Sequence, residues 1–160
     1  MKQLFESERI RFVEVSEEQV PDYLRMVNDL EHVGRFIGRR TEPVSEEKER
    51  KWVREKLDEK AVLFSMIEKS SGAFIGNIEL MDFTETEAEL GIAITAAKQE
   101  LGYGTEAIRA VTDYAFDQLV LKRVFLKVYP DNARAIRVYE KCGFREYGRT
   151  EEDVFMEILA

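Results

Sequence analysis

The sequence contains few residues of several types, and each shortage excludes a class of protein. Among 160 residues there is one cysteine, Cys142, and one histidine, His32. A single cysteine cannot form an internal disulfide. A single histidine excludes a His-rich metal site and any Ser-His-Asp or Cys-His catalytic unit that needs a second histidine. No apolar run approaches the ~20 residues of a membrane span, and residues 1–6 show no secretory signal. We therefore expect a cytoplasmic protein with no metal.

The charge of the chain is acidic, with a net value of −8. An acidic surface repels nucleic-acid phosphates, so neither DNA nor RNA is expected as a partner, and no membrane is expected either. The same charge attracts cationic amines, although solubility alone explains it more simply. The length suits one domain, residues 1–160.

The apolar pattern predicts the element order β-α-α-β-β-β-α-β-α-β-β. Helices are expected after Ser16, Ser45, Gly102 and Asp131, of which Ser16, Ser45 and Asp131 have the character of N-caps. The expected strands span residues 9–15, 62–68, 73–82, 87–94, 123–129, 144–147 and 154–159. A helical crossover joins strand 87–94 to strand 123–129, so these two should be parallel within a mixed sheet.

Residues 99–104, Gln-Glu-Leu-Gly-Tyr-Gly, lie between a predicted strand and a predicted helix. Backbone N–H groups at a helix start are free to donate hydrogen bonds, and the helix dipole adds partial positive charge. Glycine allows the backbone to approach phosphate oxygens closely. The segment therefore predicts a site for a phosphorylated cofactor.

Two other phosphate-binding motifs compete for this turn. Gly102, Gly104 and Ala107 match a dinucleotide fingerprint, with Asp131 as the acid beyond the next strand. However, that fold needs more βα units than the remaining chain can supply. No Gly-Lys-Ser or Gly-Lys-Thr is present, so a P-loop is excluded.

The segment after strand 123–129 contains Asn132 followed by Ala135, Tyr139, Lys141 and Gly143-Phe144. Together with the Gln-x-x-Gly-x-Gly motif, this pattern resembles the GNAT superfamily of acetyl-CoA-dependent N-acetyltransferases. Residues 88–92 and 104–107 are similar to its RimJ/RimL-like branch. The resemblance implies an α/β (α+β) fold of GNAT type, in which about four helices flank a mixed, mostly antiparallel seven-stranded sheet with a splayed central parallel strand pair.

The resemblance also implies where acetyl-CoA binds. A bulge in strand 87–94 splays the parallel pair, backbone groups there hydrogen-bond the pantetheine arm, and the diphosphate lies over residues 101–105. The cofactor-binding residues implied are Ile92, Ala93, Ile94, Gln99, Leu101, Gly102, Tyr103, Gly104, Thr105, Asn132 and Tyr139.

The implied reaction is direct attack of an amine on the thioester. Tyr139 is implied as the acid that protonates the leaving thiolate. Glu89, on the cofactor-binding strand, is the first candidate for the base, with Glu79 and Asp82 as alternatives. Cys142 lies at a helix C-terminus, where the dipole disfavours a thiolate, so a filler role is expected rather than an acyl-enzyme.

The acceptor is expected to be an amine: a protein N-terminus, a polyamine or a small amino compound. A homodimer is possible. Two alternative functions stay open from the sequence, namely a noncatalytic acyl-CoA sensor on the same fold and a small nicotinamide- or flavin-dependent protein.

Overall fold

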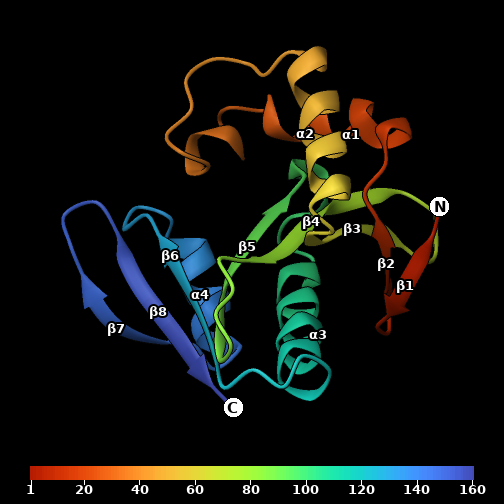
Figure 1. The fold of residues 1–160 in the computed structure, drawn as a ribbon. Coiled ribbons are helices and arrows are strands. Elements are labelled where there is room, and N and C mark those ends of the chain that lie inside the picture. The colour runs from red at the N-terminus through yellow and green to blue at the C-terminus, as the bar shows by residue number, and fades with distance from the viewer. The chain divides into compact units, whose positions relative to one another are not determined.

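The computed structural model describes residues 1–160 and contains one eight-stranded sheet with four α-helices. Its strands hydrogen-bond in the order β1-β2-β3-β4-β5-β6-β8-β7 (Figure 1). Internal contacts divide the chain into two compact units. The first comprises Met1–Glu79 with Ile92–Tyr103, and the second comprises Leu80–Gly91 with Gly104–Ala160.

The first unit holds the N-terminal strands and two helices. Its elements are β1 (Gln3–Glu6), β2 (Ile10–Glu14), η1 (Glu17–Gln19), α1 (Val20–Val27), η2 (Gly34–Phe36), α2 (Glu46–Asp58), β3 (Val62–Glu68), most of β4 (Phe74–Met81), the end of β5 (Glu87–Ile94) and η3 (Ala96–Lys98). Val20 and Tyr23 of α1, Val53 of α2 and Leu63 of β3 form one buried cluster, so both helices are packed onto the sheet by apolar contacts.

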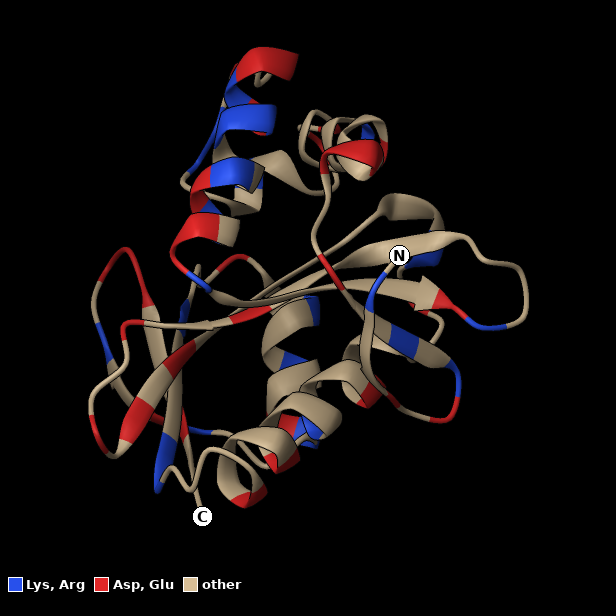
Figure 2. Cartoon of the chain, turned by 45° about the vertical axis from the view of Figure 1, so that its right-hand side comes forward, with Lys and Arg blue, Asp and Glu red and all other residues tan.

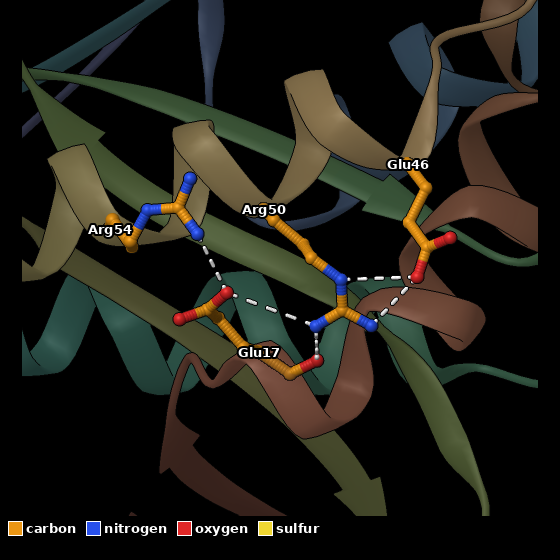
Figure 3. Close-up of polar contacts among 4 residues, drawn as sticks. All are labelled: Glu17, Glu46, Arg50 and Arg54. Atoms are coloured by element: carbon orange, nitrogen blue, oxygen red, sulfur yellow. Dashed lines mark hydrogen bonds and ion pairs between the residues drawn. The ribbon is translucent and has the colours of Figure 1, made fainter.

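A charged seam joins η1 to α2. Arg54 donates to the Glu17 carboxylate at 2.9 Å, and Arg50 donates to the Glu17 carbonyl oxygen at 3.1 Å and to Glu46 Oε1 at 2.8 Å (Figure 3). Basic and acidic residues alternate along the rest of α2 as well (Figure 2). These exposed pairs contribute little stability individually, because water and salt screen them. The seam sets how η1 meets α2, while Val53 supplies the buried contact.

The second unit contains the other strands and helices: the start of β5, α3 (Tyr103–Asp117) from Gly104 onward, β6 (Arg123–Val128), α4 (Ala133–Lys141), β7 (Arg145–Arg149) and β8 (Val154–Leu159). Val124, Leu126 and Val128 alternate as buried residues along β6, and Met156 is buried opposite them on β8. One face of this part of the sheet is therefore core, as period-two alternation requires.

The mixed sheet predicted from the sequence is confirmed. β5 and β6 are parallel, whereas β1–β2, β2–β3, β6–β8 and β7–β8 are antiparallel. The expectation of seven strands is wrong, because β1 adds an eighth at the edge. Four residues are too few to show a reliable alternation. Phe5 of β1 stacks on Phe12 with ring centroids 4.3 Å apart, and it also meets the distant Phe64 edge-on with ring centroids 5.0 Å apart.

Two of the three predicted N-caps are wrong in detail. Ser45 accepts a hydrogen bond from the Lys48 N–H at 3.2 Å, as predicted. Ser16 makes no such bond, and its hydroxyl is buried without a partner. The fourth helix is capped by Asn132 instead of Asp131, because the Asn132 side chain accepts from the Ala135 N–H. No helix is both long and apolar enough to cross a membrane, and the cytoplasmic location stays a prediction.

Candidate active site

The parallel pairing of β5 with β6 is short. Its register covers Glu87–Glu89 opposite Arg123–Phe125, although β5 continues to Ile94 and β6 continues to Val128. Beyond this point β6 stays paired with β8 on its other side. Glu89 is therefore the last paired residue of β5 before the two strands cease to pair, and its side chain is half-buried.

The far end of β5 lies against a glycine of β4, Gly76. A Cβ atom placed on Gly76 would come within 2.0 Å of the Ala93 carbonyl oxygen and 2.9 Å of Ile94 Cα. The Thr95 N–H donates to the Ile75 carbonyl oxygen at 2.9 Å. Only a residue without a side chain permits this approach. The bulge itself stays a prediction.

The strand end also departs from the burial pattern of a core strand. Ala88 and Leu90 are buried, whereas Ile92, Ala93 and Ile94 are all half-buried. Alternation therefore stops at the residues that were expected to face the pantetheine arm.

After β5 the chain makes a turn, residues 95–102, which we call the cofactor turn. It contains η3 and two residues with positive φ, Glu100 at +62° and Gly102 at +85°. α3 begins at Tyr103, so the first four N–H groups of the helix, those of residues 102–105, have no intrahelical acceptor. Gly102 and Leu101 are exposed. These residues therefore fit a diphosphate, since N–H donors without an intrahelical acceptor lie on an accessible helix start.

The side chains of the predicted cofactor residues Gln99 and Tyr103 bond to the protein itself. Gln99 Nε2 donates to the Ile94 carbonyl oxygen at 2.9 Å and to the His32 carbonyl oxygen at 3.3 Å. The Tyr103 hydroxyl donates to Glu68. Both side chains therefore fix the turn by bonds within the protein, and the role of the two residues in cofactor binding stays a prediction.

Two residues that sequence reasoning missed also hold this turn. Glu68 at the end of β3 accepts from Tyr103 and Lys98, and Arg9 Nη1 donates to the Leu101 carbonyl oxygen at 3.0 Å. Glu68 and Tyr103 are 35 residues apart in sequence, so no local pattern could reveal the contact. Gly76 was also missed, although a glycine inside a strand is a known sign of close backbone approach.

In the second unit, helix α4 places Asn132 and Tyr139 about two turns apart. Asn132 is the N-cap, and its Oδ1 accepts from the Ala135 N–H at a long 3.4 Å. Tyr139 is buried, with its ring centroid 5.9 Å from that of Phe144. Burial first, and then the nearby Cys142 thiolate charge, raise the pKa of Tyr139 to about 12. The phenol is therefore fully protonated at neutral pH and available as a proton donor.

Cys142 follows α4 and lies beside the first turn of α3. Its Sγ donates to the Thr105 carbonyl oxygen at 3.7 Å. Burial raises the pKa of the Cys142 thiol, against the smaller opposing charges of Arg109 and Lys141. The thiol is thus neutral and hydrogen-bonded to the protein, which is the condition of a structural cysteine.

The two alternative bases, Glu79 and Asp82, lie on β4 and directly after it. Glu79 of β4 forms an ion pair with Lys56 of α2 at 3.5 Å, and each side chain is 22% exposed. Asp82 follows β4 in an exposed turn with φ +51°. No group of three or more His, Cys, Asp or Glu residues that could hold a metal ion is found.

Comparison with known proteins agrees with this geometry. The sequence profile of the "Acetyltransferase (GNAT) domain" matches residues 9–145. The chain belongs to the GNAT acetyltransferase domain family. Members of this family use acetyl-CoA, whose diphosphate suits the start of α3, where the first N–H groups have no intrahelical acceptor. The RimJ/RimL-like branch within the family stays a prediction.

A spermidine N(1)-acetyltransferase of Vibrio cholerae is 32% identical over 93 residues, which are 57% of this chain and 54% of that protein. The chain thus spans about half the length of the curated relatives it matches. Two solved structures share the GNAT fold, each covering 96% of both chains: a GNAT acetyltransferase from Bacillus anthracis (TM-score 0.86, 23% identity) and spermidine N-acetyltransferase from V. cholerae in complex with CoA and spermine (TM-score 0.84, 21% identity).

Proposed function

We propose that this chain is an acetyl-CoA-dependent N-acetyltransferase that moves the acetyl group from the thioester to an amine by direct attack in a ternary complex. The observation that carries the proposal is the accessible start of α3, which follows a β5 end whose backbone lies against Gly76. Backbone donors at residues 102–105 suit the diphosphate, and the half-buried residues 92–94 suit an extended pantetheine arm.

In the proposed reaction, the neutral amine attacks the thioester carbonyl carbon. A C–N bond forms, the C–S bond breaks, and the amine proton passes to a base. Glu89 is our candidate for this base, because it lies where β5 ceases to pair with β6. The ammonium form of a free amine has a pKa of about 10, so the amine must first lose this proton before it can attack. The base then takes the proton that the nitrogen sheds after attack.

We propose that Tyr139 donates a hydrogen bond, and then a proton, to the sulfur of the leaving CoA. With its pKa at about 12, full transfer to a thiolate of pKa ~8.5 would be uphill by about 5 kcal/mol. A buried site also raises the pKa of a thiol, as it does for Cys142 next to Tyr139. A CoA thiolate leaving in this environment is therefore a stronger base than in water, and a hydrogen bond from Tyr139 stabilises it before the proton moves.

The condition of Cys142 supports direct transfer. An acyl-enzyme route needs an accessible thiolate, whereas Cys142 is neutral, buried and bonded to the Thr105 carbonyl oxygen. Transfer therefore needs no covalent intermediate on this chain.

We propose an amine acceptor with cationic character in solution, with polyamines as the first class to test. The support is the net charge of −8 and the similarity to proteins named for spermidine. A protein N-terminus and small amino compounds are the other classes in the proposal.

The test is release of CoA thiol from acetyl-CoA in the presence of a panel containing spermidine, spermine, an unblocked peptide and a small monoamine. We expect one class to accelerate thiol release above the rate without amine. Calorimetry with CoA accompanies the assay. Binding of CoA with no acceleration by any amine would instead support the sensor, and absence of CoA binding would overturn the proposal.

A further inference from the structure

The carboxylate of Glu68 contacts residues on both sides of the bend of the cofactor turn, Lys98 and Tyr103. The Lys98 Nζ, on η3 before the turn's bend, lies 3.0 Å from Glu68 Oε2, and the hydroxyl of Tyr103, the first residue of α3, donates to the same oxygen. The Ser71 hydroxyl donates to Glu68 Oε1 at 2.6 Å. One side chain on β3 therefore holds the middle of the turn, through Lys98, and the residue that follows the turn, Tyr103.

Arg9 makes a second attachment at the same end. Its guanidinium donates to the Leu101 carbonyl oxygen at 3.0 Å and lies 4.2 Å from the centroid of the Tyr103 ring. Tyr103 is thus held by its hydroxyl through Glu68 and by its ring face through Arg9. A residue with both ends restrained fixes the direction of the backbone N–H groups that follow it.

The turn needs such restraint because its backbone is strained. Glu100 adopts φ +62°, a left-handed conformation that costs a residue with a side chain roughly 1 kcal/mol or more. Such a conformation persists only when its surroundings impose it. The Glu68 carboxylate is well suited to impose it, because its side chain is 13% exposed and that of Lys98 is 21% exposed, so water competes only weakly for the contact.

We infer that Glu68 is a positioning residue for the cofactor: by holding Lys98 and Tyr103 it aims the N–H groups at the start of α3 at the diphosphate of acetyl-CoA. This inference rests on the proposed function. Glu68 itself does not touch the cofactor. The Lys98 ammonium group offsets the negative charge that Glu68 places beside the turn, so the anchor does not repel an anionic ligand.

The hydrogen bonds from Ser71, Tyr103 and Lys98 lower the pKa of Glu68 to about 2. The carboxylate therefore stays ionised, and the anchor intact, at any pH at which an amine acceptor can lose its proton. No change of cofactor affinity with pH is expected from this group between pH 5 and 9.

The experiment compares Tyr103→Phe and Glu68→Gln with a matched control, Glu6→Gln. Glu6 pairs with Lys69 at 3.1 Å, so the control breaks an ion pair whose lysine immediately follows Glu68, without touching the turn. For each protein the measurements are the Kd for CoA by calorimetry, the KM for acetyl-CoA, the KM for the amine, kcat, and Tm.

Each test variant should weaken CoA binding by roughly tenfold, the usual effect of losing a hydrogen bond to a charged group. The KM for acetyl-CoA should rise in parallel, while kcat and the amine KM stay within about twofold. The control should leave all four constants unchanged. Because Tyr103→Phe and Glu68→Gln break the same contact, the double variant should bind CoA about as weakly as either single variant.

Equal CoA affinity in the wild type and in Tyr103→Phe would overturn the inference while leaving the proposed function intact. A loss of Tm with no change in the KM for acetyl-CoA would also overturn it, since Glu68 would then be merely structural. If Glu68→Gln does not fold, Tyr103→Phe decides alone, because it keeps the ring and its contact with Arg9. If the wild type itself fails to bind CoA, both the proposed function and this inference are wrong.

Discussion

Two ionisable side chains, one in each unit, show how differently the surroundings of two functional candidates are built. Glu68, in the first unit, is surrounded by donors, and these hold its pKa at about 2. Tyr139, in the second unit, is surrounded by apolar groups, and burial raises its pKa to about 12. Hydrogen bonds favour the charged form and desolvation favours the neutral form. The cofactor turn is thus fixed by charge, whereas the proposed acid is kept protonated by the apolar core.

The contrast separates binding from chemistry. Polar anchors can hold a backbone in place without contacting a ligand, as Glu68 does through Tyr103. A proton donor must instead remain protonated until the leaving group needs it, and burial supplies that condition for Tyr139. Variants of Glu68 should therefore change the KM for acetyl-CoA, whereas variants of Tyr139 should change kcat.

The largest effect is expected from Tyr139→Phe, which removes the phenol hydroxyl and keeps the ring contact with Phe144. We predict a fall in kcat of roughly 100-fold or more, since general acid catalysis contributes about that much. Affinity for CoA should stay within about twofold. Steady-state kinetics and calorimetry measure both, with Tyr147→Phe, at a tyrosine that is 48% exposed, as the control. An unchanged kcat would remove Tyr139 from the mechanism.

Gly76→Ala tests the end of β5. The new methyl group would lie 2.0 Å from the Ala93 carbonyl oxygen, so the backbone must move. We predict a loss of about 1–3 kcal/mol in the free energy of unfolding, the usual cost of overpacking, together with weaker CoA binding. Denaturant unfolding provides the measurement. In the control Gly148→Ala, the nearest atom is 3.8 Å away, and stability should hardly change. Similar stabilities for the two variants would contradict the close approach.

Acid unfolding should sharpen the difference between charge and burial. Because the pKa of Glu68 falls from 4.5 to about 2 on folding, its stabilising contribution is complete above about pH 4.5 and disappears as the pH falls toward 2. The stability difference between wild type and Glu68→Gln, present at neutral pH, should therefore narrow across this window. Urea titrations at several pH values would detect this narrowing. A stability difference that stays constant with pH would show that these contacts do not lower the pKa of Glu68 in the native state.

The smallest effect is expected from Asn132→Ala. The cap bond to the Ala135 N–H is long, at 3.4 Å, so its loss should cost only about 0.5 kcal/mol of stability. Ser45→Ala removes the corresponding cap of α2 and provides a matched control. If Asn132 contacts acetyl-CoA, only the Asn132 variant should also raise the KM for acetyl-CoA. If the KM for acetyl-CoA is the same in both variants, Asn132 only caps α4 and does not contact the cofactor.

Elements with local causes could be predicted from the amino-acid order alone. The apolar pattern located β3 and β5 at their observed bounds, and the glycine turn before α3 was predictable because glycine and a helix start are local signals. The parallel pairing of β5 and β6 followed from the intervening crossover helix.

Features that join distant residues could not be predicted in this way. The strand β1 exists because Phe5 meets Phe12 and Phe64. The anchor of the cofactor turn joins Glu68 to Tyr103 and Arg9 to Leu101, and the end of β5 lies against Gly76. Such contacts leave no periodic pattern, since a hydrogen bond or a close backbone approach depends on where the folded chain places two residues and not on the neighbours of either one.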